Sequence, residues 1–497
     1  MPGRRVAIVG GGNAALCAAI SAREHGSEVD LFERAPFDLR GGNSRFTAGA
    51  IRTTYDGVEQ IRELMPELTE DEVENTDFGH YSEADFFDDL GRVTQYRTDP
   101  DLAELLVKES FPTLLWLRQY GVRFLPLYGR QSFEIDGKRR FWGGLTVEAW
   151  GGGQGLIDQL TEIASKLGVT IHYERRVTAI ERSESGLTLS INARTKQSFD
   201  SVVLACGGFE SSAEMRAQYL GPNWDLAKVR GTKFNTGDGI RMAQDIGAAT
   251  TGHWSGCHAV AWDLNAPMFG DLAVGDGFQK HSYPFGIVVN ADGERFLDEG
   301  ADFRNYTYAK YGREILHQPN HLAWQVFDQK VTHLLRDEYR IREVTKVTAD
   351  TLNELGELMD GVNAASFVHT VEIYNAAVDD SIAFDPTIKD GRGTRGLTVN
   401  KSNWANRLDT PPFEAFGVAC GITFTFGGLQ VDSNAAVLDE HGDRIEGLYA
   451  AGEIVGGLYF HNYPGGSGLM AGAVFGRSAG ARAASTKMDV FRHGSTS

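Results

Sequence analysis

Hydrophobic and polar positions at the start of the chain alternate in blocks that predict a βαβ unit. Residues 6–9 (VAIV) form a short apolar run typical of a buried strand, residues 13–25 have helical spacing, and residues 29–33 (VDLFE) indicate a second strand. Glycines at 10–12 separate the first strand from the helix. This order is typical of the opening of a doubly wound α/β fold.

The remaining chain divides into regions of different pattern. Residues 55–120 have largely helical, charge-rich spacing, and residues 176–204 predict a pair of strands. Residues 250–410 mix strands and helices and are rich in aromatic side chains, and glycine-rich patterns return after them. We therefore predict a discontinuous Rossmann-like nucleotide-binding domain, formed by residues 1–249 and 411–497, with an inserted α+β capping domain at 250–410.

Composition and charge narrow the classes of partner and compartment. The net charge of −19 disfavours nucleic acid as a partner, because its phosphates would be repelled. The four cysteines are far apart and form no CxxC pair, so we expect no metal, haem or iron–sulfur site and a reducing, cytoplasmic compartment. No run reaches the roughly 18 apolar residues of a membrane span. A secretory signal is disfavoured because cleavage would remove the glycine loop.

The glycine loop carries the most specific motif. Gly10, Gly12 and Ala15 fit G-x-G-x-x-A between a strand and a helix, so the backbone can approach a pyrophosphate at the helix N-terminus. Glu33 stands at the end of the second strand, where its carboxylate can accept hydrogen bonds from a ribose hydroxyl. The spacing and context together predict a bound dinucleotide.

Further glycine clusters favour FAD over a nicotinamide dinucleotide. They stand at 41–44 (GGNS), 206–208 (CGG), 448–453 (LYAAGE) and 465–469 (GGSGL). The last cluster begins an Ala/Gly-rich helix, whose first amides could hold a flavin carbonyl. Separated clusters suit a long, extended ligand, whereas any one of them alone is more often a turn.

Seven longer segments resemble the flavoprotein family of fumarate reductases and succinate dehydrogenases, and within it the tricarballylate dehydrogenases. They are GGGNAALCAA, RGGNSRFT, GHWSGCHAV, QKHSYPFGIVVN, ERFLDEGADFRNYTYAKYGR, TFTFGGLQVD and NYPGGSGL. The resemblance implies an FAD domain with an inserted cap, and hydride transfer between a substrate carbon and flavin N5. Members with covalent flavin carry a His just after GG-x-S, whereas Arg45 stands here, so we expect non-covalent FAD.

The motifs and the resemblance together give a set of expected cofactor positions. These are Gly10, Gly12, Asn13, Ala14, Ala15, Glu33, Arg34, Gly41, Gly42, Asn43, Ser44, Val177, Gly207, Gly208, Asp238, Gly452, Glu453, Gly466, Ser467, Gly468 and Leu469.

The resemblance also implies a catalytic set, which matches in part. The family's proton-transferring arginine follows an RF-x-x-E motif, and Arg304 follows that motif one residue later than in soluble fumarate reductases. His258 corresponds to the family's first substrate histidine. Tyr463 replaces the family's carboxylate-binding arginine, and the proton-relay Glu and Arg fall near residues 279–282. That segment contains His281, which could bind a carboxylate as an imidazolium.

Each of these four residues also has a plainer reading. Arg304 could be a surface ion-pair partner, His258 and His281 could be satisfied core residues, and the ring of Tyr463 could serve packing alone.

We expect an FAD-dependent dehydrogenase or reductase that acts on a C–C bond next to a carboxylate, with a tricarballylate-like substrate and proton transfer by Arg304. The departures from the family pattern put plain fumarate or succinate in doubt. The Tyr-Pro-Gly at 463–465 is also similar to ketosteroid dehydrogenases, whose substrate is a neutral ketone. An electron-transfer flavoprotein without an organic substrate is a second alternative. Since the chain carries no haem or cluster motif, we expect a separate electron-transfer partner.

Overall fold

The predicted βαβ unit forms one side of a six-stranded sheet. The computed structural model describes residues 3–183 and 186–485, so the last residues of the predicted 411–497 segment lie outside it. In spatial order the strands are β20 (Ala436–Leu438), β21 (Arg444–Ala450), β13 (Ser201–Leu204), β1 (Arg5–Val9), β2 (Glu28–Phe32) and β9 (Thr170–His172). All neighbours pair in parallel except β20 and β21. The predicted doubly wound α/β fold is confirmed.

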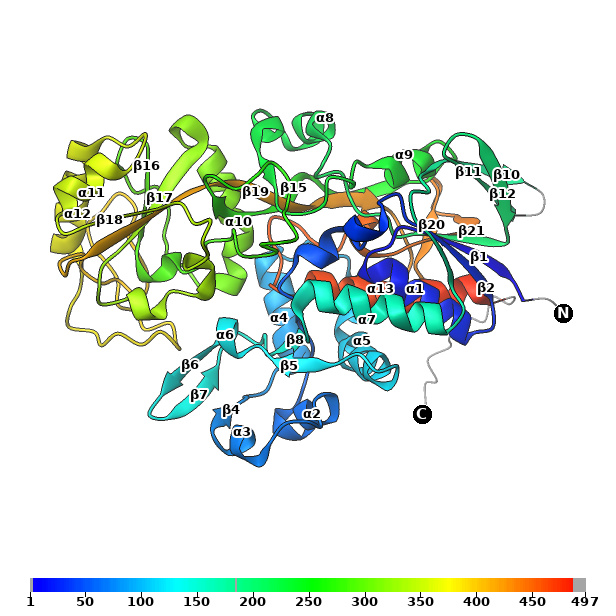
Figure 1. Ribbon diagram of the computed structural model, residues 1–497, viewed down its shortest axis with the longest axis horizontal. Coiled ribbons are helices and arrows are strands. Elements are labelled where there is room, and N and C mark those ends of the chain that lie inside the picture. Colours follow the sequence, from blue (N-terminus) through cyan, green and yellow to red (C-terminus); the bar gives the residue numbers. More distant parts are fainter. Residues whose placement is uncertain (1–2, 184–185, 486–497) are drawn as a thin grey trace.

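Two helices pack closely along this sheet, at the right of Figure 1. They are α1 (Asn13–Glu24) and α13 (Ser467–Ala484). A Cβ atom on Gly476 would lie 2.4 Å from the carbonyl oxygen of Ala14, and one on Gly480 would lie 2.1 Å from that of Ala18. Only glycine therefore fits at these positions. The close approach brings α1 and α13 together at the cofactor motifs.

The segment 176–204 holds more strands than the predicted pair. Alternating polar residues allow a three-stranded antiparallel sheet to form at the edge of the fold, and a fourth strand, β13, joins the main sheet. The three strands are β10 (Val177–Ser183), β11 (Gly186–Ile191) and β12 (Thr195–Phe199).

The segment 55–120 is largely helical, as predicted, and lies below the main sheet in Figure 1. Asp99 caps the longest of its helices and Pro100 occupies the first turn, where a missing N–H costs nothing. The helices here are α2 (Gly57–Leu64), α3 (Glu70–Glu74), α4 (Glu83–Val93) and α5 (Pro100–Gln119), followed by α6 (Tyr128–Gln131) and α7 (Gly152–Lys166). The small strands beside them are β3 (Ala50–Ile51), β4 (Thr76–Asp77), β5 (Phe124–Pro126), β6 (Ser132–Ile135), β7 (Lys138–Phe141) and β8 (Val147–Ala149).

A second sheet forms around one very long strand, β19 (Phe413–Leu429). Its partners are β14 (Lys228–Val229), β15 (Thr250–Asp263), β17 (Leu322–Phe327) and β18 (Lys346–Ala349), and β16 (Ile287–Asn290) pairs with β17. Figure 1 shows β15 and β19 running side by side from the second sheet at the left toward the first sheet at the right. This long antiparallel pair connects the two parts of the molecule.

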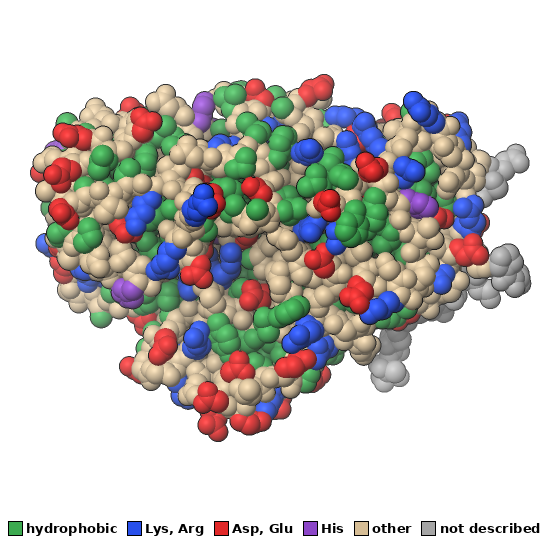
Figure 2. All heavy atoms as spheres, viewed as in Figure 1, with side chains coloured by type: hydrophobic (Ala, Val, Ile, Leu, Met, Phe, Trp, Pro, Cys, Tyr) green, Lys and Arg blue, Asp and Glu red, His purple; other side chains and the backbone are tan. Residues whose placement is uncertain are grey.

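Helices cover the second sheet and bury an apolar cluster that includes Ile287, Trp324 and Phe367. The helices of this part are α10 (Tyr308–Leu316), α11 (Leu352–Leu358) and α12 (Ala364–Ala377), and the short α8 (Ala213–Met215) and α9 (Asp238–Gln244) stand between the two parts. On the face shown in Figure 2, acidic and basic side chains are interspersed. None of the described helices is long and apolar enough to cross a membrane.

Candidate active site

One continuous cavity extends from the N-termini of α1 and α13 to the second sheet. Its first part, which we call the glycine-lined half, is walled by residues 9–14, 33–35, 42–44, 466, 468, 469, 471 and 472 among others. Its second part, the arginine-lined half, is walled by Arg130, Arg230, His258, Asp276, His281, Arg304, Tyr308 and Tyr463.

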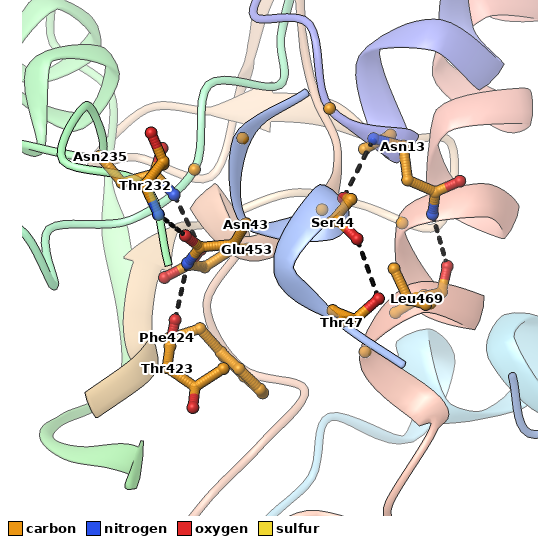
Figure 3. Close-up of a pocket in the computed structure, with 18 of the residues that line it drawn as sticks. Asn13, Asn43, Ser44, Thr47, Thr232, Asn235, Thr423, Phe424, Glu453 and Leu469 are labelled. Carbon is orange, nitrogen blue, oxygen red and sulfur yellow. Dashed lines mark hydrogen bonds between the residues drawn. The ribbon is translucent and has the colours of Figure 1, made fainter. Parts of the chain in front are cut away.

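Backbone groups dominate the glycine-lined half. Gly12 precedes α1 and has no side chain that could cap this helix. The first backbone N–H groups of α1 therefore form part of the cavity wall. Gly10 adopts φ +118°, and a Cβ atom there would lie 2.2 Å from the Ala205 carbonyl oxygen. The Asn13 amide donates to Ser44 Oγ at 3.2 Å, which ties the two glycine loops together (Figure 3). The arrangement is a ready-made anion site.

The second wall of this half is the start of α13. Gly466, in the left-handed conformation, precedes the helix and likewise offers no capping side chain. Asn13 Nδ2 donates to the Leu469 carbonyl oxygen at 2.7 Å, as Figure 3 shows, so the two helix starts are held side by side. Arg52, fully buried, donates from Nε to the Gly465 carbonyl oxygen at 2.8 Å and supports the turn from behind.

Charged groups mark the far end of the glycine-lined half. Glu33 is buried, and its Oε1 accepts from the Ala35 amide at 2.8 Å. Burial raises the pKa of this carboxyl group, while the Ala35 amide opposes the rise. Arg34 donates to Asp238 Oδ2 at 2.9 Å, and Arg176 binds the same carboxylate. These residues can hold the ribose and base of a dinucleotide.

Asn43 joins this half to the long strand β19. Its amide Nδ2 donates to Glu210 Oε1 at 2.6 Å. Figure 3 shows that Nδ2 also donates to the Thr423 carbonyl oxygen, at 2.6 Å, and that Oδ1 accepts from the Thr232 amide. Glu210 and Glu453 are both buried here, and burial raises the pKa of each. Asn43 therefore has a structural role in addition to the expected contact with the flavin.

Most of the expected cofactor positions line the cavity, and four of them do not. Ala15 lies in the core of α1, Gly41 lies against Ile157, and Gly208 lies where a Cβ atom would meet Glu453. Ser467 turns its hydroxyl to the Pro464 carbonyl oxygen at 2.7 Å. These four shape the wall from behind. Arg45 does not line the cavity either, and donates to the Asp38 carbonyl oxygen.

The four expected catalytic residues all line the arginine-lined half. The ring of Tyr308 lies between the two histidines, with its centroid 5.0 Å from that of His258 and 4.7 Å from that of His281. Its hydroxyl group forms a very short hydrogen bond with that of Tyr463. Among the described residues, both ring nitrogens of His258 and Nε2 of His281 find no hydrogen-bond partner.

Both histidines lie where the charged form is disfavoured, which argues against the imidazolium expected at position 281. Burial lowers the pKa of His281 well below its usual value, and the charges of Arg304, Arg230 and Arg130 lower it further. Burial also lowers the pKa of His258, with a smaller effect from Arg230. A neutral imidazole can still donate one hydrogen bond to a ligand.

Arg304 is not a surface residue, because its side chain is only 11% exposed. It donates from Nη2 to the Arg130 carbonyl oxygen and to Gln131 Oε1, and Nη1 lies 3.9 Å from Glu338 Oε1. Burial lowers the pKa of Arg304, the Glu338 carboxylate raises it, and the charge of Arg130 lowers it again. Removing a proton from this guanidinium is therefore less costly than in water.

The sequence did not reveal that Arg130 and Arg230 bind the same carboxylate, that of Asp276. Asp276 Oδ1 accepts from Arg230 Nε at 2.8 Å, and its Oδ2 accepts from Arg130 Nη1 at 3.0 Å. These residues come from distant segments without a motif. Tyr308 was missed too, although a signal existed: it stands four positions after Arg304, one helical turn along the chain.

Comparison with known proteins places this cavity in context. A family model described as FAD binding domain matches residues 5–469. The probable fumarate reductase Ifc3 of Shewanella frigidimarina (strain NCIMB 400) is 29% identical over 495 residues, which cover 98% of this chain and 75% of that protein. The 3-oxosteroid 1-dehydrogenase of Mycobacterium tuberculosis (strain ATCC 25618 / H37Rv) is 29% identical over 374 residues, 68% of this chain and 64% of that one.

The fold is similar to a solved structure as well. The open conformation of a flavocytochrome c3 fumarate reductase matches with a TM-score of 0.69 and 26% identity, over 97% of this chain and 78% of that one. The alignment extends along almost the whole chain and is not confined to one of the two sheets.

Proposed function

We propose that this chain, which belongs to the FAD binding domain family and is an FAD-dependent oxidoreductase of CH–CH groups like the fumarate reductases, acts on a tricarballylate-like polycarboxylate. It would desaturate, or in reverse reduce, a bond α,β to a carboxylate. The observation that carries this proposal is the charge of the arginine-lined half. The described residues that line this half include three guanidinium groups, those of Arg130, Arg230 and Arg304, and one carboxylate, that of Asp276. Such a wall attracts an anion.

The groups around the histidines suit carboxylate oxygens. His258 and His281 can each offer a ring N–H, and the Tyr308–Tyr463 pair can offer one hydroxyl proton outward. Buried donors without a partner are costly, and the cost ends when an acceptor binds. Since burial disfavours the charged form of both histidines, we infer that they orient the substrate by hydrogen bonds, while the arginines supply the charge.

Desaturation requires a hydride acceptor and a base. FAD, held by the glycine-lined half, would supply the hydride acceptor. The carbon next to the carboxylate loses a proton at the same time, and we propose that Arg304, in its neutral guanidine form, accepts this proton at a nitrogen atom and becomes the guanidinium. Burial and the neighbouring Arg130 charge favour the neutral form that can do so, and Glu338 stabilises the charged form that results. In the reductive direction the same group donates the proton.

A neutral ketone is the second candidate, and one specific observation favours it. The hydrogen-bonded hydroxyl groups of Tyr308 and Tyr463 could polarise a carbonyl group, and a 3-oxosteroid 1-dehydrogenase is among the relatives. The three arginines speak against this candidate, because Asp276 and Glu338 bring only two negative charges, and an uncharged substrate would leave one positive charge uncompensated in a buried site.

Anaerobic reduction of the flavin tests the two candidates. We expect tricarballylate to bleach the visible absorption of the oxidised flavin. The trimethyl ester of tricarballylate keeps the carbon skeleton without the charges and serves as the matched control. Bleaching by 3-ketosteroids, or equal bleaching by acid and ester, would contradict the proposal.

We also propose a separate electron-transfer partner and non-covalent FAD. The partner is needed because electrons left on the flavin must be passed on before the next oxidation. We propose non-covalent FAD because Arg45 stands where covalent relatives carry a histidine. Rapid turnover with oxygen and stoichiometric peroxide would contradict the first proposal. Flavin that stays with acid-precipitated protein would contradict the second.

A further inference from the structure

A second, smaller cavity lies directly behind Arg304. Arg304 and His281 line both this cavity and the main one. The remaining wall, which includes Phe133, Trp142 and Arg336, is mostly aromatic. We call this space the rear chamber. It measures about 20 Å³, against about 260 Å³ for the main cavity, so it has room for a group of a few atoms and not for a further ring.

Four buried nitrogen atoms of residues that line the rear chamber lack a partner. They are Trp142 Nε1, Arg304 Nε, Arg336 Nη2 and His281 Nε2, all buried and without a hydrogen bond to any described residue. The first three can only donate, and His281 Nε2 donates in one tautomer. The aromatic rings between them offer no acceptor. Unpaired buried donors destabilise a protein, so their concentration in one small chamber indicates a site for an acceptor.

The charges around the rear chamber favour an anion as that acceptor. Arg304 and Arg336 bring two positive charges, and Glu338 compensates one of them. Burial lowers the pKa of Arg336 to about 9, the charge of Arg304 contributes further, and Glu338 opposes both. Arg336 is fixed from the other side, since Nη1 donates to the Gly129 carbonyl oxygen at 2.9 Å and its guanidinium lies 4.3 Å above the ring of Phe133.

The rings also hold Trp142 in place. Trp142 stacks on Phe303 with 5.1 Å between ring centroids, and the Arg304 guanidinium lies 5.7 Å from the Trp142 ring. The indole N–H is therefore a rigid donor beside two guanidinium groups, which is the geometry that binds a planar carboxylate.

We propose that the rear chamber is a carboxylate subsite, which receives an arm of the substrate beyond the two carbons that react. This inference rests on the proposed function, and it narrows the substrate class to compounds with three carboxylates. The carboxylates on the two reacting carbons lie in the main cavity, and the third passes beside Arg304 and His281, which border both spaces. A dicarboxylate lacks this arm.

The test compares two substrates that differ by one arm. Tricarballylate carries a carboxymethyl group where methylsuccinate carries a methyl group. Trp142→Phe removes one donor and keeps the ring, and Arg336→Gln removes one charge. In anaerobic flavin reduction by the holoenzyme, each variant should raise the ratio of the tricarballylate KM to the methylsuccinate KM roughly 10-fold or more, as expected for a lost hydrogen bond to a charged group. Trp150→Phe, on an exposed ring outside both cavities, is the matched control.

The outcomes separate this inference from the proposed function. A parallel change of both KM values, or no change of either, would overturn the subsite while the proposed function stands. If neither compound reduces the parent enzyme, the proposed function fails. Calorimetric titration of tricarballylate into the oxidised holoenzyme then decides on the chamber, since binding that is equal in parent and Trp142→Phe proteins would overturn it.

Free anions provide the last arm of the experiment. If the chamber receives a substrate arm, formate should lower the KM for methylsuccinate in the parent enzyme and leave that for tricarballylate unchanged. Formate binding that saturating tricarballylate does not displace would show a site for a free anion and would overturn the assignment to the substrate.

Discussion

The two halves of the cavity recognise their ligands by different means. In the glycine-lined half, the wall at the starts of α1 and α13 is mostly backbone, because glycines there leave no side chain between the backbone and the cavity. In the arginine-lined half, the wall consists of long charged and aromatic side chains from distant segments. A wall of backbone accepts one shape of ligand, and side-chain substitutions elsewhere in the chain do not change that shape. A wall of side chains can change its ligand by single substitutions.

The largest effect on the glycine-lined half is expected for Gly12→Val. A Cβ atom on Gly12 lies 3.5 Å from its nearest neighbours, Gly41 O and Ser44 Oγ, so the protein itself has room for the first carbon. The rest of the valine enters the space of the expected pyrophosphate. We expect a protein that folds normally and contains no FAD, measured by the flavin absorbance of the purified protein and by its thermal unfolding.

Gly10→Val is the matched contrast. Gly10 has φ +118°, and its Cβ atom would lie 2.2 Å from the Ala205 carbonyl oxygen, so this variant should be destabilised even as apoprotein. If Gly12→Val protein keeps a full complement of flavin, the phosphate loop has been misplaced.

The second prediction concerns the arginine-lined half alone. Arg304→Ala should lower the rate of flavin reduction by about 10²–10⁴, the usual loss for a positioned acid–base group. FAD should remain bound, since Arg304 contacts Arg130, Gln131 and Glu338 and none of the glycine loops. Arg304→Lys should rescue poorly, because an ammonium group is more strongly hydrated and lacks the planar fork. Stopped-flow absorbance measures both, and a rate within a few-fold of the parent would exclude Arg304 as the proton carrier.

The same contrast explains how far the sequence predicts the molecule. The doubly wound fold and most of the glycine-lined half follow from local spacing, because a strand, a glycine loop and a helix are consecutive in the chain. The group around Asp276 could not be predicted in this way. Arg130 lies in α6 and Arg230 directly follows β14, and only the tertiary fold brings their charges to one carboxylate.

The third, short strand of the 176–204 segment was missed for a related reason. Its sequence, TKQSF, is mostly polar, and its pairing with β11 is visible only in the folded sheet. His281 was found by resemblance, but its lowered pKa results from burial and from three arginines of other segments.

A third prediction tests whether the two tyrosines of the arginine-lined half bind the substrate while Arg304 transfers the proton. Tyr463→Phe and Tyr308→Phe each remove one hydroxyl group of the hydrogen-bonded pair. If the pair binds the ground and transition states alike, the KM for substrate should rise roughly 2–10-fold and kcat should change little. Steady-state kinetics with an artificial electron acceptor measures both parameters. A fall in kcat comparable to that of Arg304→Ala would assign proton chemistry to the tyrosines and favour the ketone candidate.

The smallest expected effect concerns acid. Burial raises the pKa of Glu33 in one half and lowers that of His258 in the other, so acidification should destabilise only the arginine-lined half. As the pH falls below about 6.5, the usual histidine pKa, the unfolded chain binds a proton that folded His258 does not, and stability is lost. His258→Gln does not titrate. Between pH 7.5 and 5.5 it should therefore lose about 1 kcal/mol less unfolding free energy than the parent protein, as measured by urea denaturation. The matched control is His333→Gln, at an exposed position, which should behave as the parent protein. An equal acid loss in His258→Gln and parent proteins would mean that His258 is not held neutral, and the hydrogen-bonding role proposed for it would have to be replaced by a charged one.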